Sequence, residues 1–169
     1  LSFYNIKEYI LIGHSDGASI ALIYAGESPG EGLLGIINEA PHVFCEAITI
    51  HSIEKIFDLY KKGNLRKRLK RHHGENVDNA FFGWANVWLD PEFLSWNIES
   101  SLPKISVPQL IIQGNEDEYG TSAQVEAIAA QSGSTVETCF LSNCGHSPHI
   151  DRENATLNVM DHFVKNLLS

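Results

Sequence analysis

The sequence predicts an α/β protein with a parallel sheet of about four strands flanked by helices. Four short and mostly apolar runs have the length of buried strands, at residues 9–12, 33–38, 109–113 and 136–141. Strand, helix, strand order at the start of the chain implies parallel pairing with a right-handed crossover. A long block with helical apolar spacing, residues 42–102, then interrupts the alternation. We therefore expect a core at 1–41 and 103–169 and a helical insertion at 42–102.

Turn and capping residues separate the elements of the predicted core. Glycine, serine and proline at 26–30 stop the first helix, and Thr121 or Ser122 caps a later one. The expected elements are, in order, a strand at 8–13, a helix at about 16–25, a strand at 33–38, the helical block, a strand at 109–113, a helix at 121–131, a strand at 136–141 and an amphipathic helix at 152–168.

The composition is that of an ordinary soluble domain. Apolar residues make up 43% of the 169 residues and charged residues 20%, which supports a real hydrophobic core. The net charge of −9 disfavours nucleic acid and anionic lipid as partners of the whole molecule. No apolar run approaches the length of a transmembrane helix. We expect a small-molecule substrate as the partner, with no nucleic acid and no membrane.

The cysteines and the first residue of the chain give two further indications. Its three cysteines, Cys45, Cys139 and Cys144, are too few and too scattered for a disulfide framework, which favours a reducing, cytoplasmic location. The chain begins at Leu1, and its only methionine is Met160. It enters its first strand within a few residues, so we expect a fragment of a longer protein.

The most informative stretch is Gly-His-Ser-Asp-Gly at 13–17, which lies between the first strand and the first helix. A serine on a sharp strand-to-helix turn is a nucleophile elbow. Such a turn needs small neighbours, and we expect a Cβ at Gly13 or Gly17 to collide with the adjacent backbone. The turn also puts Ser15 at a helix N-terminus, where backbone N–H groups face developing negative charge. The alternative is a plain glycine-rich turn with Ser15 as a helix cap.

Two more loops with polar residues follow strand ends. The strand at 109–113 leads into Gly114-Asn115-Glu116-Asp117, and the strand at 136–141 leads into a loop that holds His146. Open parallel sheets place their sites at the carboxyl ends of strands, where Ser15 also lies. The order Ser15, Asp117, His146 is the serine, acid, histidine order of one particular fold.

With these motifs, the chain resembles the α/β-hydrolase fold family in its cap-bearing branch. We expect the chain to lack the N-terminal part of that fold. The resemblance rests on GHSDG at 13–17, GNED at 114–117 and NCGHSPH at 143–149. It implies Ser15 as nucleophile, His146 as general base and then acid, and Asp117 as the residue that orients the imidazole. It also implies that residues 42–102 form a helical cap over the active site.

Each role has an alternative. Glu116 and Glu118 flank Asp117 and are alternative acids, although the family places its acid three residues after the glycine. His149 is the alternative base, three residues beyond His146. That histidine pair lacks further ligands at supporting spacing, so we expect no metal and no cofactor.

The helical block contains the residues that we expect to contact substrate. Seven of the twelve basic residues lie at 61–71, where Leu65 and Leu69 give the run an inward face and leave its charges to solvent. The alternatives for this run are steering of an anionic substrate and, less favoured, nucleic acid. Aromatic residues of the block line a pocket or form its own core. The candidate substrate-binding residues are His14 in the core and Trp84, Trp88 and Trp96 in the block.

The predicted function is a serine hydrolase with a Ser-His-Asp triad. His146 accepts the proton of Ser15, Asp117 stabilises the imidazolium, and the backbone N–H of Asp16 is one oxyanion donor. A serine nucleophile argues against the dehalogenase and epoxide-hydrolase branches, which use aspartate there. Esters, thioesters and the carbon–carbon bond of a ring-cleavage product stay open as substrates. The alternative is a non-catalytic fragment or binding module that retains the triad residues.

The start of the chain predicts low activity and self-association. The second oxyanion donor of the fold comes from a loop that precedes the nucleophile strand. We therefore expect little or no hydrolase activity from the 169 residues alone. The strand at 8–13 becomes a sheet edge, and its apolar residues and unpaired backbone groups favour self-association.

Overall fold

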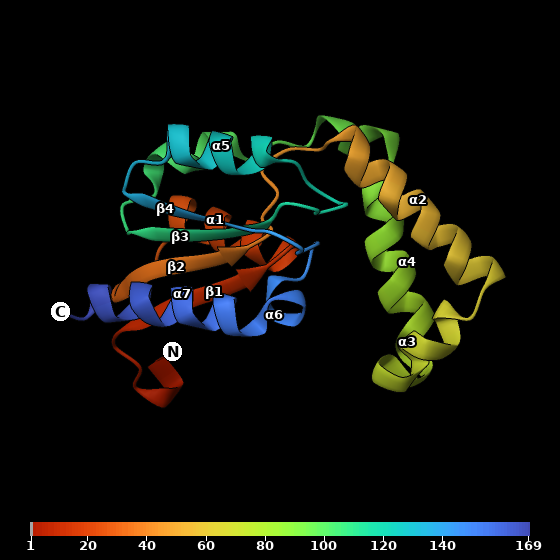
Figure 1. The fold of residues 1–169 in the computed structure, drawn as a ribbon, viewed down its shortest axis with the longest axis horizontal. Helices are drawn as coiled ribbons and strands as arrows, with labels where there is room; N and C mark the ends of the chain where they lie inside the picture. Colours follow the sequence, from red (N-terminus) through yellow and green to blue (C-terminus); the bar gives the residue numbers. More distant parts are fainter. Residues whose placement is uncertain (1) are drawn as a thin grey trace. The chain divides into compact units, whose positions relative to one another are not determined.

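The computed structural model describes residues 2–169, which form two compact units. The first unit combines the chain up to Phe44 with Asn97–Ser169, and the second unit is Cys45–Trp96. Figure 1 shows the strands in the first unit and the long helices α2 to α4 in the second.

The first unit contains a four-stranded sheet in which every neighbouring pair is parallel. Apolar and β-branched residues form most of each strand, which favours extended backbone. The strand order in the sheet follows the order in the sequence, β1-β2-β3-β4. The strands are β1 (Tyr9–His14), β2 (Leu33–Glu39), β3 (Gln109–Gly114) and β4 (Val136–Leu141). This sheet confirms the α/β class that the apolar runs predict.

Helices cover both faces of the sheet (Figure 1). On one face, Phe163 of α7 (Glu153–Leu167) packs into a core with Ile37, Leu110 and Ile112. Side chains alternate along a strand, so Ile36 and Ile111 point to the other face. There the sheet meets α1 (Asp16–Glu27) and α5 (Ser122–Gln131).

Helix capping follows the predicted chemistry in α5. The hydroxyl of Thr121 accepts a hydrogen bond from the N–H of Ala123 at 3.2 Å, so Thr121 and not Ser122 is the cap. One short helix is absent from the sequence prediction, namely α6 (Pro148–Asp151), which precedes α7. A four-residue helix carries too little periodic pattern to be recognised from sequence.

The second unit consists mainly of α2 (Ala47–Lys62), α3 (Leu65–His73) and α4 (Val77–Trp88). Asp78 of α4 joins all three helices. It accepts a hydrogen bond from the Tyr60 hydroxyl at 2.6 Å and a two-pronged ion pair from Arg66 at 2.6 and 2.8 Å. Lys70 pairs with Glu75 of the short 3₁₀ helix η2 (Gly74–Asn76) at 2.7 Å. Lys62 pairs with Asp58 within α2 at 3.0 Å, so three of the seven basic residues at 61–71 form ion pairs within the unit itself.

The second unit is shorter at both ends than the predicted insertion, residues 42–102. At its beginning, the backbone N–H of Val43 donates to the side chain of Gln124 in α5 at 2.7 Å. At its end, the 3₁₀ helix η4 (Glu99–Lys104) packs on α1, where the Ser101 hydroxyl donates to Glu27 at 2.9 Å. These contacts bind residues 42–44 and 97–102 to the sheet unit. The other short 3₁₀ helices are η1 (Ser2–Tyr4) and η3 (Pro91–Ser95).

Candidate active site

Three polar side chains from three strand ends meet in the first unit. Ser15 follows β1, Asp117 follows β3 and His146 follows β4. The Nε2 atom of His146 lies 2.8 Å from the Oγ of Ser15. Its Nδ1 lies 2.9 and 3.0 Å from the two carboxylate oxygens of Asp117. A carboxylate only accepts, so Nδ1 carries the proton and Nε2 is left to accept the hydrogen bond of the Ser15 hydroxyl.

The backbone at Ser15 is strained. Its φ is 55° and its ψ is −124°, a region that non-glycine residues rarely occupy. The Ser15 N–H donates to the carbonyl of Glu39 at 2.9 Å, and the Ser15 carbonyl accepts from Ala18 at 2.9 Å. These bonds tie the residue to β2 and to the first turn of α1. The surrounding structure thus holds Ser15 in a conformation that it would otherwise avoid.

The two glycines of the motif have different environments. A Cβ at Gly13 would lie 2.5 Å from the carbonyl oxygen of Gly17 and 2.6 Å from the Cα of Ala18. A Cβ at Gly17 would meet no atom within 4 Å. The expectation of a collision is therefore right for Gly13 and wrong for Gly17. The difference arises because the turn folds α1 back over Gly13, whereas Gly17 lies on an open side of the helix.

Asp117 accepts hydrogen bonds from several groups besides His146. The N–H groups of Tyr119 and Gly120 donate to Oδ1 at 2.8 and 3.3 Å. The side chain of Gln113 donates to Oδ2 at 2.7 Å. With only 1% of its side chain exposed, the carboxylate depends on these donors to remain charged.

The pKa of Asp117 reflects a balance between burial and these partners. Burial, the largest influence, raises the pKa of Asp117. The hydrogen bond and the charge of His146, followed by the N–H of Tyr119, outweigh it, so the pKa lies below its ordinary value. Asp117 is therefore ionised at neutral pH, as an acceptor for an imidazole must be.

The neighbouring glutamates have other positions. Glu116 and Glu118 are exposed, whereas Asp117 is buried. Glu118 accepts the backbone N–H of His146 at 3.3 Å, so it contacts the loop of the histidine. Of the three acidic residues, the one that bonds the imidazole is Asp117.

Gln113 is a site residue that sequence reasoning missed. It lies on β3, is 2% exposed and donates to Asp117 and to the carbonyl of Gly120. Buried amides require hydrogen-bond partners. A glutamine near the end of a buried strand is therefore the signal that could have identified Gln113.

His14 binds the loop that carries His146. Its Nε2 lies 2.7 Å from the carbonyl oxygen of His146, and a carbonyl only accepts, so this nitrogen carries a proton. Desolvation by burial lowers the pKa of His14, and the residue is neutral at pH 7. Its ring lies 5.1 Å from that of His146, centroid to centroid. The sequence suggests substrate binding for His14, and the structure gives it this additional contact.

His149 faces a different carboxylate from His146. Its Nδ1 lies 3.0 Å from Oε2 of Glu39, and its backbone N–H donates to the same oxygen at 2.9 Å. The ring of His149 therefore forms its own histidine–carboxylate pair, and it is His146 that contacts Ser15.

Asp16 is the first residue of α1 and directly follows Ser15. Its N–H therefore belongs to the positive end of the helix dipole, next to the Ser15 hydroxyl. This position agrees with the requirements for an oxyanion donor.

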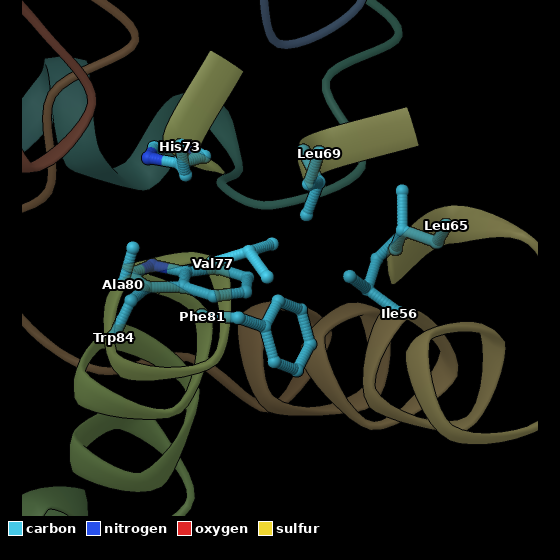
Figure 2. Close-up of a pocket in the computed structure, with 8 residues that line it drawn as sticks. All are labelled: Ile56, Leu65, Leu69, His73, Val77, Ala80, Phe81 and Trp84. Carbon is cyan, nitrogen blue, oxygen red and sulfur yellow. The ribbon is translucent and has the colours of Figure 1, made fainter. Parts of the chain in front are cut away.

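The tryptophan candidates all lie in the second unit. Trp88 and Trp96 pack with Phe93 in an aromatic cluster whose ring centroids are 5.1 to 5.7 Å apart. Trp84 lines a pocket of about 330 Å³, which is apolar apart from His73. Figure 2 shows the pocket, whose lining residues are Ile56, Leu65, Leu69, His73, Val77, Ala80, Phe81 and Trp84. The aromatic residues thus form part of the unit's own core and also line a pocket in it.

Residues 2–169 contain no group of three or more His, Cys, Asp or Glu side chains arranged so that it could hold a metal ion. No helix in that range combines the length and the apolar character needed to cross a bilayer.

Comparison of the structure with solved structures identifies the fold. A membrane phospholipase A described as a bacterial virulence factor matches 99% of this chain and 60% of its own, with a TM-score of 0.72 and 22% identity. The esterase RhEst1 from Rhodococcus sp. ECU1013 matches 99% of this chain and 69% of its own, with a TM-score of 0.68 and 14% identity. MGS-M2, an α/β hydrolase from a deep-sea metagenome library of the Medee basin, has a TM-score of 0.68 and 20% identity over 96% of this chain and 67% of its own.

The chain thus spans 60% of the length of the phospholipase and slightly more than two thirds of the other two proteins. Neither a protein-family model nor a curated protein matches the sequence. The match over nearly the whole chain, the parallel sheet and the strained turn at Ser15 agree with one another. The chain has the α/β-hydrolase fold that its three motifs resemble.

Proposed function

We propose that this chain carries the catalytic triad of a serine hydrolase that cleaves carboxylic esters. The observation that carries the proposal is the continuous series of hydrogen bonds from Ser15 through His146 to Asp117. A weak nucleophile, a base within hydrogen-bond reach and a carboxylate that orients the base are what acyl transfer requires. The solved structures with this fold include a phospholipase and esterases, which supports the same reaction class.

The proposed reaction begins when Nε2 of His146 takes the proton of the Ser15 hydroxyl. The freed oxygen attacks the ester carbonyl carbon, and the ionised Asp117 stabilises the imidazolium. The N–H of Asp16, at the N-terminus of α1, donates to the tetrahedral oxyanion. His146 then gives its proton to the departing alkoxide, and a water molecule, activated by the same imidazole, hydrolyses the acyl–Ser15 intermediate.

The second unit is proposed to be the cap, with its aromatic residues contacting the acyl group. Its apolar pocket supports an apolar substrate portion, because such pockets bind ligands mainly by desolvation. Thioesters and the carbon–carbon bonds of ring-cleavage products are the alternative substrates.

The test is labelling of the protein with a fluorophosphonate, together with a p-nitrophenyl acetate assay. Fluorophosphonates react with activated serines, so labelling is detected even where turnover is slow. Labelling of the wild-type chain that Ser15→Ala abolishes would support the proposal. A folded wild-type chain that takes up no label at Ser15 would favour the alternative, a non-catalytic binding module.

A further inference from the structure

Glu39 is a buried carboxylate that the proposed reaction does not use. It is the last residue of β2 and is 4% exposed. A carboxylate is costly to bury unless donors compensate for lost water. Its donors are the backbone N–H and the ring Nδ1 of His149, at 2.9 and 3.0 Å from Oε2. Both come from α6, which directly follows the loop that carries His146.

The backbone of Glu39 binds the nucleophile. Its carbonyl oxygen accepts the N–H of Ser15 at 2.9 Å. Glu39 thus binds Ser15 through its main chain. Through its side chain it binds His149, three residues beyond His146. A single residue of β2 therefore connects the two groups between which a proton must move.

His14 makes a second connection of the same kind. It is the partner of Glu39 in the parallel register of β1 and β2, and it directly precedes Ser15. Its Nε2–H donates to the carbonyl of His146 at 2.7 Å. The segment from His146 to His149 is thus bound at both ends to adjacent residues of two neighbouring strands.

The rings reinforce these bonds. The His14 ring packs edge-on against the His149 ring, with centroids 4.9 Å apart. His149 therefore contacts both Glu39 and His14. Displacing a catalytic group by about 1 Å can lower a rate on the order of a hundredfold, so the fixation of this loop has consequences for the reaction.

We propose that Glu39 and His14 are positioning residues, which fix the loop of His146 to the strand ends that carry and hold Ser15. The inference rests on the proposed function for its kinetic consequence. Neither residue exchanges a proton with the substrate. Their role is to keep Nε2 of His146 within hydrogen-bond distance of the Ser15 hydroxyl.

The main test compares Glu39→Leu with Glu39→Gln. Glutamine keeps a carbonyl oxygen that accepts the two His149 hydrogen bonds, whereas leucine has a similar size and no acceptor. Fluorophosphonate labelling of Ser15 is expected to slow about tenfold or more in Glu39→Leu and by less than about threefold in Glu39→Gln. The matched control is Glu137→Gln, an exposed glutamate on β4, which is expected to label at the wild-type rate.

A kinetic comparison separates positioning from substrate binding. In a form of the protein that turns over p-nitrophenyl acetate, Glu39→Leu is expected to lower kcat and leave KM unchanged, since the Glu39 side chain contacts His149 and is not assigned to the substrate. Wild-type labelling rates in a folded Glu39→Leu variant would overturn the proposal. A higher KM with an unchanged kcat would overturn it too.

A second pair of variants decides the matter if Glu39→Leu does not fold. His14→Gln keeps an N–H donor for the His146 carbonyl, and His14→Phe keeps the ring but has no donor. Ser15 labelling is expected to be at least about threefold slower in His14→Phe than in His14→Gln, as for a displaced catalytic group. Equal rates in the two folded variants would overturn the positioning role.

A proton NMR measurement tests the positioning without any activity. The Nδ1 proton of His146, between the ring and the Asp117 carboxylate, should give a far-downfield resonance in wild type and Glu39→Gln. It should broaden or vanish in Glu39→Leu, and an unchanged resonance would contradict the inference. If the wild-type chain shows this resonance but takes up no label at Ser15, the proposed function fails while the positioning is still tested.

Discussion

The Nε2 of His146 lies 2.8 Å from the Oγ of Ser15, although 131 residues separate them in the sequence. The parallel sheet makes this possible, because all four strands run in the same direction and the carboxyl ends of β1 and β4 lie on the same side of the sheet. His149, only three residues further on, bonds Glu39 instead. We therefore expect replacements of these two histidines to differ strongly in their effects.

In any longer, active form of the protein, replacing His146 by alanine should remove nearly all Ser15-dependent turnover. We expect a loss on the order of a thousandfold or more, as in other triads, because the serine then lacks its base. His149→Ala keeps the base and loses one ring contact with Glu39, so its loss should be much smaller. Steady-state kinetics on p-nitrophenyl acetate measure both. The opposite ranking would make His149 the base.

Gly13→Ala and Gly17→Ala should differ in stability. The new methyl group at position 13 meets three backbone atoms within 2.7 Å, so we expect it to cost about 3 kcal/mol or more of unfolding free energy. At position 17 it meets nothing and replaces a helical glycine, so a gain of up to about 1 kcal/mol is expected. Urea unfolding followed by circular dichroism compares the two. Similar stabilities would mean that α1 is not held closely over Gly13.

Much of this architecture could be predicted from the sequence because its signals are local. The apolar runs identify the strands. The loops with candidate polar groups are then found within a few residues of the strand ends. The sequence did not identify Glu39 or Gln113 as site residues. Each lies at or next to the end of a buried strand and bonds a partner that only the tertiary fold brings near. Gly17 was misjudged for the same reason, because whether a Cβ collides depends on what packs over it.

The strain at Ser15 should appear as a stability difference between Ser15→Gly and Ser15→Ala. Both variants lack the hydroxyl of the proposed nucleophile and should be inactive. Glycine tolerates a φ of 55° with a ψ of −124°, whereas alanine retains the Cβ that makes this conformation unfavourable. We expect Ser15→Gly to be about 1 kcal/mol more stable than Ser15→Ala in urea unfolding. An advantage for alanine would argue against strain at the elbow.

His14 should make stability depend on pH. Burial lowers its pKa in the folded chain below the value of about 6.5 expected when unfolded. The unfolded state then binds the proton first, so this contribution to stability is complete above that pH and is lost as the pH falls towards the folded pKa. Between pH 7 and 5, His14→Gln should lose less in melting temperature than wild type. His72→Gln, which replaces an exposed histidine, is the control and should follow wild type. Parallel curves for wild type and His14→Gln would contradict the prediction.

The edge of the sheet at β1 should promote association of this chain with itself. Within residues 2–169, β1 pairs with β2 alone, and Ile12 in its middle is 62% exposed. Such an edge offers unpaired backbone groups beside apolar side chains, and a lysine there blocks strand addition. We expect light scattering to show dimers or larger species of the wild-type chain and a shift towards monomer in Ile12→Lys. The control is Leu157→Lys, an exposed leucine of α7, which should leave the association unchanged. A monomeric wild-type chain, or equal effects of the two lysines, would mean that β1 is not the surface through which copies associate.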